Sequence, residues 1–232
     1  MSSLIFPQQE QTTAKISGSE KLFPIHRIFC VGRNYHAHAA EMGVEVDKSQ
    51  HEPFYFTKHP SALIPSGSSV KYPPGTQNYH YEMEFVVAIG KAGFNVSEKD
   101  ASDLIFGYAT GLDMTRRDLQ LKARSNGRPW DLGKDFEESA VISEITPKSE
   151  TGLINNGAIV LMVNGEVKQS SDINLLIWNV NEIISHLSKF YHLQPGDLIY
   201  TGTPDGVGSV EAGDKIFGSI TGLKDISLEI YK

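Results

Sequence analysis

The segment HYEMEFVVAIG, residues 80–90, joins a charged start to a short apolar run that a glycine closes. A short run rich in β-branched and aromatic residues predicts a buried strand. Successive strand side chains point to opposite faces, so His80, Glu82 and Glu84 should share one face and Tyr81 the other. Two carboxylates less than about 8 Å apart repel each other unless something positive lies between them. The pattern therefore fits a metal site, or a strand end whose polar face meets water.

The composition restricts the partners and the compartment. The 232 residues carry a net charge of −7 and form no basic stripe, so we expect no nucleic-acid partner. The single cysteine, Cys30, excludes an internal disulfide and favours a reducing compartment. The start, MSSLIFPQQEQ, lacks the basic segment of a signal, and no run approaches the ~20 apolar residues of a membrane span. We therefore expect no membrane partner and a cytoplasmic location.

Local patterns predict a chain of short strands with few helices. Residues 1–24 should form a short N-terminal arm, either a strand pair or a partly loose segment. Strands are expected at 27–31, 53–56, 67–72, 105–109 and 197–201, with a closing pair within 213–231. Asn164-Gly165 should be the two-residue turn of a hairpin. Helices are expected at 35–42, 97–101, 113–126 and 175–191, with Asn174 near the cap of the last, while 132–136 should be strand or loop.

The helix predicted at 35–42 carries His38 and Glu41 three residues apart, with Asn34 as a possible cap. A carboxylate beside an imidazole fixes its tautomer and raises its basicity, as activation of a water requires. An exposed pair without function is the alternative. The polar loop 44–52 that follows could be mobile.

Asp113, Arg117 and Gln120 fall within about 60° of one another if residues 113–126 are one helix. Such a stripe is either surface decoration or part of a site. The loop 202–208, GTPDGVG, matches no nucleotide-binding motif. It could still offer backbone N–H groups to a carboxylate, or be an ordinary turn.

Four segments together are more specific: GRNYHAHAAEMG, HYEMEFVVAIG, GYATGLDMTRRDLQ with GRPWDLGKDF, and GDLIYTGTPDGVG. In this order and spacing they resemble the fumarylacetoacetate hydrolase family, above all its acylpyruvate and fumarylpyruvate hydrolases and its oxaloacetate decarboxylases. The resemblance implies an α+β fold, a mixed β-sheet roll with few short helices. It also implies a catalytic domain at residues 25–232, a homodimer, and Mg2+ or Mn2+ as the cofactor.

The resemblance also implies roles for nine residues. It implies that the metal ligands are Glu82, Glu84 and Asp113, the catalytic residues His38, Glu41 and Lys134, and the substrate-binding residues Arg117, Gln120 and Thr203. An all-oxygen set of ligands suits Mg2+ or Mn2+ better than zinc. Three carboxylates around a dication leave a net charge of −1, so an anionic substrate needs the positive charges of Arg117 and Lys134.

The function expected from this resemblance is metal-dependent hydrolysis of a carbon–carbon bond in a 2,4-diketo acid, an acylpyruvate such as fumarylpyruvate, with release of pyruvate. The alternative enzyme is an oxaloacetate decarboxylase or tautomerase. A metal-binding protein without turnover is the other class, but a structural metal has no need of the His38–Glu41 base.

Overall fold

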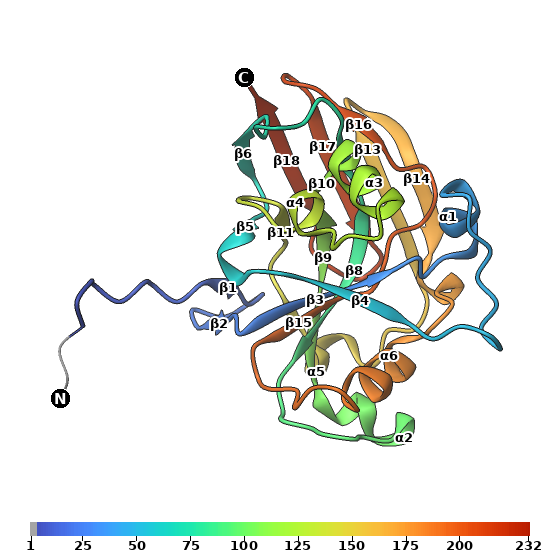
Figure 1. The fold of residues 1–232 in the computed structure, drawn as a ribbon. Helices are drawn as coiled ribbons and strands as arrows, with labels where there is room; N and C mark the ends of the chain where they lie inside the picture. The colour runs from blue at the N-terminus through green and yellow to red at the C-terminus, as the bar shows by residue number, and fades with distance from the viewer. Residues whose placement is uncertain (1–3) are drawn as a thin grey trace.

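The computed structural model describes residues 4–232. Within them the chain is built of β-sheets with few short helices (Figure 1), so the predicted α+β class is confirmed. The central sheet has the order β4-β3-β15-β8-β9-β11-β5, with β12 paired to β9. Its strands are β3 (Arg27–Gly32), β4 (Phe54–Lys58), β5 (Leu63–Pro65), β8 (Met83–Ile89), β9 (Ile105–Asp113), β11 (Ala140–Ile142), β12 (Thr146–Pro147) and β15 (Asp197–Tyr200).

A second sheet has the order β14-β13-β17-β18-β6 and packs against the central one. Its strands are β6 (Ser68–Lys71), β13 (Ala158–Val163), β14 (Glu166–Asp172), β17 (Lys215–Ile220) and β18 (Ile226–Tyr231). The hairpin β13–β14 turns at Asn164 and Gly165, both with positive φ as a two-residue turn requires, so this prediction is confirmed. Two smaller sheets pair β10 (Thr115–Arg116), β7 (Tyr79–Tyr81) and β16 (Gly208–Val210), and β1 (Thr13–Lys15) with β2 (Leu22–Pro24).

The helices lie at the ends and edges of the sheets (Figure 1). They are α1 (His36–Glu41), α2 (Glu98–Ala101), α3 (Arg117–Ser125), α4 (Asp131–Lys134), α5 (Lys148–Thr151) and α6 (Val180–Leu187), with 3-10 turns at Pro60–Ala62, Ser102–Leu104 and Ile173–Leu175. Among the described residues, none of these helices has the length and apolar character needed to cross a bilayer.

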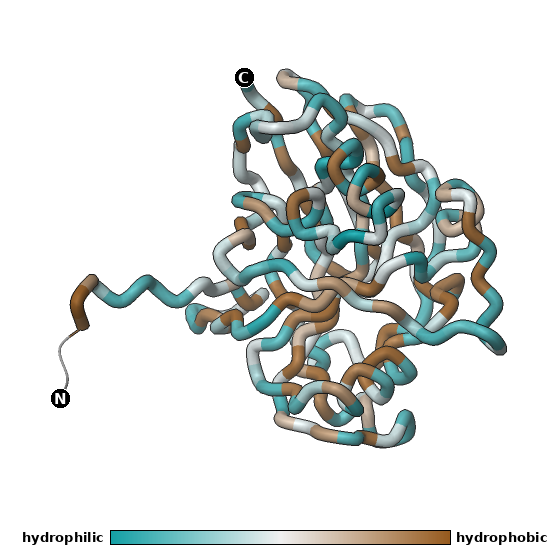
Figure 2. Tube along the Cα trace, in the orientation of Figure 1, coloured by the Kyte–Doolittle hydropathy of each residue, from teal (hydrophilic) through white to brown (hydrophobic). Residues whose placement is uncertain are grey.

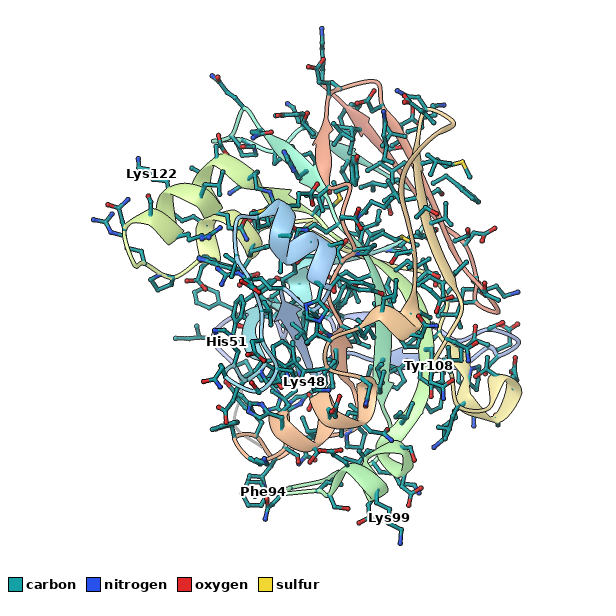
Figure 3. The ribbon with its side chains drawn as sticks, turned by 90° about the vertical axis from the view of Figure 1, so that its right-hand side faces the viewer. Lys48, His51, Phe94, Lys99, Tyr108 and Lys122 are labelled. Atoms are coloured by element: carbon teal, nitrogen blue, oxygen red, sulfur yellow. The ribbon has the colours of Figure 1, made fainter. Side chains whose placement is uncertain are left out.

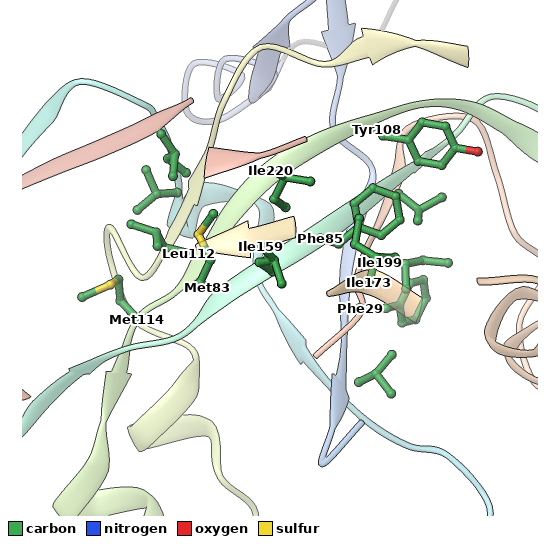
Figure 4. Packing of buried hydrophobic residues seen from close by; sticks show 14 of the residues in the cluster. Phe29, Met83, Phe85, Tyr108, Leu112, Met114, Ile159, Ile173, Ile199 and Ile220 are labelled. Carbon is green, nitrogen blue, oxygen red and sulfur yellow. The ribbon is translucent and has the colours of Figure 1, made fainter. Parts of the chain in front are cut away.

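Strand β8 is buried on both faces, which explains its continuous apolar run. Met83 and Phe85 point into the core between the two large sheets, where Figure 4 shows them beside Ile159. Val86 packs on the opposite face, in a second cluster that contains Cys30. Because every second side chain of a strand points to the same face, Glu84 and Glu82 lie on the same face as Val86. Both carboxylates therefore lie at the end of a buried layer.

The N-terminal segment is only partly an arm. Residues 4–8 extend away from the body of the molecule (Figure 2), whereas β1 and β2 form the strand pair that the sequence allowed. Ala14 and Phe23 of this pair are buried in the second cluster. The first three residues of the predicted arm lie outside the described residues, and its separation from a domain at 25–232 stays a prediction.

Several local predictions are wrong, and for the two helix starts at 113 and 175 tertiary contacts explain the difference. The helix expected from residue 113 begins at Arg117, since Asp113 pairs with Ala140 at the end of β9. The stripe of Asp113, Arg117 and Gln120 on one helix therefore does not exist. Residues 132–134, part of the segment 132–136 that was expected as strand or loop, belong to α4.

The helix expected at 175–191 begins only at Val180, where Asn179 and Glu182 form a reciprocal capping box. The residues just before it are held by Asn34, whose carbonyl oxygens accept from the backbone N–H groups of residues 177 and 178. Asn34 consequently does not cap α1, and the N-cap position belongs to Tyr35.

Candidate active site

Three buried carboxylates meet at one end of the central sheet. Glu82 lies between β7 and β8, Glu84 is the second residue of β8, and Asp113 is the last residue of β9. The backbone N–H of Asp113 donates to the carbonyl of Glu82 at 2.9 Å, which fixes the relation of the two strand ends. One oxygen of each carboxylate lies within 4.8 Å of the others. The structure therefore brings together the predicted metal ligands.

Three cations surround these carboxylates. Lys134 Nζ donates to Glu82 Oε2 at 2.7 Å and to Asp113 Oδ2 at 2.8 Å, and Arg117 forms an ion pair with Glu82. Lys58 Nζ lies 2.9 Å from Asp113 Oδ1. No sequence motif pointed to Lys58, and the expected charge balance contained only Arg117 and Lys134. In the structure the three acids face three basic groups.

The two glutamates have opposite electrostatic surroundings. Burial raises the pKa of Glu82, but the charges of Lys134 and Arg117 outweigh it and hold the pKa well below its usual value. Burial, followed by the charges of Asp113 and Glu82, raises the pKa of Glu84 far above its usual value. The only opposing hydrogen bond found for Glu84 in residues 4–232 is the Gly202 N–H at 2.8 Å. Glu84 is thus the carboxylate with a deficit of positive charge.

The residues fit a divalent metal ion on two observations. Asp113 Oδ1 is buried and accepts no hydrogen bond within residues 4–232, because Lys58 is close to it but points its N–H groups at other acceptors. Glu84 is held against two like charges. A dication between the three acids would satisfy both, and oxygen-only donors are those of hard cations such as Mg2+ or Mn2+.

Helix α1 carries the predicted base. His38 is buried, and its Nδ1 lies 3.1 Å from Glu41 Oε2. Glu41 in turn accepts from the Gly206 N–H at 3.2 Å, and Met42 O accepts from Arg124 at 3.1 Å, which docks the helix on both sides. Figure 3 shows α1 in front of the sheets, with Lys48 and His51 in the loop that follows it. That loop is also anchored, through the Lys48–Glu182 ion pair, so the helix is closed over the site.

Arg117 begins α3 and points its side chain at the carboxylates. It donates to Glu82 and to Gln120 Oε1, and its Nε lies 3.4 Å from His80 Nδ1. Burial and the charge of Arg117 lower the pKa of His80 to about 4, so this histidine is neutral and accepts from Arg117. A guanidinium has five N–H groups. Two of them, and the Gln120 amide group, therefore remain available to a ligand.

Thr203 belongs to the predicted loop 202–208, which a buried glutamine holds in place. Gln169 Oε1 accepts from the Met83 N–H at 3.0 Å, and its Nε2 donates to Thr203 Oγ1 and Pro204 O, both at 2.9 Å. As Thr203 Oγ1 is an acceptor in this bond, its own proton is free to donate into the site. Gln169 ties the loop to the strand of the metal ligands.

One cavity collects most of the predicted residues. Its lining includes His38, Glu82, Glu84, Arg117, Gln120, Lys134 and Thr203. Asp113 lies beneath this cavity, bonded to Lys134, and Glu41 stands behind His38. Another cavity, of about 470 Å³, lies between Tyr108, Asn155 and Val180 and contains none of them.

Two residues that support the site, Lys58 and Gln169, were not predicted from the sequence. Lys58 follows Phe54 and Phe56 at strand spacing, a signal that could have placed its side chain inward. Gln169 lies in a hairpin strand with no motif around it, and we find no sequence signal for it.

A family model described as fumarylacetoacetate (FAA) hydrolase C-terminal matches residues 27–230. The chain therefore belongs to the fumarylacetoacetate hydrolase family, as the resemblance predicted. It is 64% identical over 189 residues to a fumarylpyruvate hydrolase of Ralstonia sp, covering 82% of this chain and 98% of the relative. It is 40% identical over 205 residues to a mitochondrial oxaloacetate tautomerase of Homo sapiens, covering 88% and 91%.

A solved structure is similar over almost the whole chain. It is the fumarylpyruvate hydrolase of Pseudomonas aeruginosa in complex with Mn2+ and pyruvate, with a TM-score of 0.95, 47% identity, and coverage of 99% of both chains. The mixed β-sheet roll that the family resemblance implied is thereby confirmed.

Proposed function

We propose that this protein is a metal-dependent hydrolase that cleaves a carbon–carbon bond in an acylpyruvate and releases pyruvate. The observation that carries the proposal is a cluster of three buried carboxylates, one with an unsatisfied oxygen, at a cavity that His38 also lines, with Glu41 bonded to His38. The Ralstonia relative, a fumarylpyruvate hydrolase, and the Pseudomonas structure, which holds Mn2+ and pyruvate, support it.

Glu82, Glu84 and Asp113 would hold Mg2+ or Mn2+. When bound, the metal supplies a Lewis acid that polarises the oxygens of the diketo acid and stabilises negative charge on the pyruvate portion. The remaining work falls to side chains of this chain.

His38 is the proposed base. With Nδ1 held by Glu41, its Nε2 takes a proton from a water molecule, whose oxygen attacks the carbonyl of the acyl group. A new C–O bond forms, the bond from the acyl carbon to the CH2 group breaks, and its electron pair stays on the pyruvate carbon. That carbon accepts a proton and becomes the methyl group of pyruvate. The acyl portion leaves as a carboxylic acid and ionises, so one water is consumed and one proton released.

Arg117, Gln120 and Thr203 are the proposed substrate-binding residues, because their remaining N–H and O–H groups line the cavity. For Lys134 we propose that the main role is to balance the negative charge of the metal ligands. Its three protons go to Glu82, Asp113 and Thr115, so it balances the charge of the ligands before it can stabilise any oxyanion.

Oxaloacetate tautomerisation is the second candidate, favoured by the 40% identical human relative. It needs a base that moves a proton between carbon and oxygen but no attacking water. The purified protein with Mn2+ should be assayed on acetylpyruvate, fumarylpyruvate and enol-oxaloacetate. Release of pyruvate from an acylpyruvate supports the hydrolase, and enol loss without any pyruvate release overturns it in favour of the tautomerase.

We also propose a cytoplasmic homodimer. Exposed apolar side chains lie on the outer face of the second sheet, where Met162 is paired with Phe217 on one side and Val167 on the other. Light scattering behind a sizing column should give twice the mass of the chain, and a monomer at micromolar concentration would refute the dimer.

A further inference from the structure

Two arginines in the same cavity have no part in holding the carboxylates. Arg33 and Arg124 line it together with Glu82, Arg117 and Lys134. Unlike Arg117 and Lys134, neither forms an ion pair with an acidic side chain within residues 4–232. They are therefore cations with no internal counterion, in a cavity that we propose to bind an anion.

The backbone holds Arg33 in an unusual conformation. It follows β3 with a φ of 56°, in the left-handed region that side chains other than glycine rarely adopt. Its guanidinium carbon lies 5.2 Å from the centre of the Phe54 ring and 5.9 Å from that of Trp130. Gly32 permits this, because a Cβ there would lie 2.0 Å from the Phe54 ring. Contacts with the two aromatic rings use no N–H group, and no hydrogen bond from the Arg33 side chain is found within residues 4–232.

Arg124 lies on α3 seven residues after Arg117, which turns it to the same helical face, within about 20°, and moves it about 10 Å along the axis. One N–H binds Met42 O at 3.1 Å. Arg117 reaches the carboxylate end of the cavity, so Arg124 must lie toward its other end. Burial, and then the charge of Arg124, lowers the pKa of Arg33, which indicates that the two guanidinium groups are close enough to repel.

We propose that Arg33 and Arg124 bind a second carboxylate at the far end of the substrate, so that the protein prefers dianionic acylpyruvates to those with an uncharged acyl group. This inference rests on the proposed hydrolase function and names the residues that select its substrate. An anion between the two arginines would remove their repulsion and give each a charge-assisted hydrogen bond.

The spacing agrees with such a substrate. A seven-carbon diacid of the fumarylpyruvate type has six carbon–carbon bonds of about 1.5 Å and spans roughly 7–8 Å when extended. That length is comparable with the rise of about 10 Å along the axis of α3 between residues 117 and 124. The flat conjugated chain would lie beside Phe56 and Trp130, which also line the cavity.

The first test compares KM and kcat for fumarylpyruvate, a dianion, and acetylpyruvate, a monoanion whose acyl group carries no charge. Arg33→Met and Arg124→Met should each raise KM for fumarylpyruvate about 10-fold or more, the effect of losing a hydrogen bond to a charged group, with little change in kcat. Acetylpyruvate should be unaffected. Arg128→Met, an exposed arginine outside the cavity, is the matched control. Equal losses on both substrates would overturn the inference and mean that the two arginines only support the structure of the cavity.

The second test needs no turnover, so it separates this inference from the proposed function. Fumarate and crotonate share a trans double bond and differ by one carboxylate. Calorimetry with saturating Mn2+ and pyruvate should show tighter binding of fumarate by the wild type, and the two variants should lose that preference while Arg128→Met keeps it. A wild type that binds both acids equally contradicts the inference. Absence of pyruvate release from either substrate contradicts the hydrolase proposal alone.

Discussion

Lys58 Nζ and Asp113 Oδ1 lie 2.9 Å apart, and both side chains are fully buried. The N–H groups of Lys58 are directed at Met114 O, Lys134 O and Ser139 Oγ, so the lysine neutralises the aspartate without occupying its oxygen. This relationship leaves Asp113 Oδ1 free for a metal ion and still prevents three acids from facing one another without a counterion.

Replacing Lys58 by Met should strongly destabilise the metal-free protein. Removing one partner of a buried ion pair typically costs about 3–5 kcal/mol, since the other charge stays buried. Urea unfolding in EDTA measures this loss, and added Mn2+ should recover part of it. Lys48→Met is the matched control, because its half-exposed pair with Glu182 contributes about 1 kcal/mol or less. Equal losses in the two variants would show that Lys58 has no such role.

Glu84→Gln should stabilise the metal-free protein at neutral pH. The folded-state pKa of Glu84 is raised, so its contribution to stability is complete below the unfolded pKa of about 4.3 and is lost as the pH rises through the folded value. The variant should therefore unfold at higher urea concentration than the wild type at pH 8, and the difference should shrink toward pH 4. With Mn2+ the order should reverse. A wild type that is the more stable of the two in EDTA at pH 8 would contradict the electrostatic account.

Lys134→Met should reduce turnover by about 100-fold or more, the size of effect seen when one electrostatic group is lost, because the metal ligands lose the cation that balances their charge beside an anionic substrate. Manganese affinity should be unchanged or higher, because Glu82 and Asp113 lose a cation that competes for their oxygens. Calorimetry with Mn2+ and a pyruvate-release assay measure the two quantities. Retention of more than about a tenth of the activity would mean that Lys134 has only a structural role.

His38→Ala should lower acylpyruvate hydrolysis by about 100-fold or more, the usual contribution of a general base. Glu41→Gln is the companion variant, since it keeps the size and hydrogen bonding of the side chain and removes its charge. We expect oxaloacetate decarboxylation, which needs no attacking water, to fall less in both variants. Equal losses on the two reactions would indicate that the pair acts by keeping α1 closed.

The sequence predicted the features that depend on short-range pattern. The alternation around Glu82 and Glu84 follows from strand geometry, and the Asn164-Gly165 turn requires two residues that tolerate positive φ. Helical spacing paired His38 with Glu41 and singled out Asp113, and the motifs of a family then implied the roles of all three. The helical period read over residues 113–126 placed Asp113 on a helix, whereas it is the last residue of a strand.

Long-range contacts explain what the sequence did not reveal. Lys58 binds Ser139, 81 residues away, and Gln169 binds Met83, 86 residues away. The periodicity of a helix or a strand relates only residues close in sequence, so it cannot connect positions this far apart. The start of α3 was misplaced for the same reason, since Asp113 and Thr115 take strand partners from distant segments, Ala140 and His80, in preference to a helical turn.

The central claim is that a metal ion held by Glu82, Glu84 and Asp113 is required to release pyruvate from an acylpyruvate. The most direct measurement is the initial rate of pyruvate release from fumarylpyruvate by EDTA-treated protein, before and after addition of Mn2+. We predict a rate at background level without the metal, and a rise of at least about 100-fold after its addition, in keeping with the several kcal/mol that a Lewis acid contributes. A rate that is the same in EDTA and in Mn2+, or no pyruvate under either condition, would contradict the account.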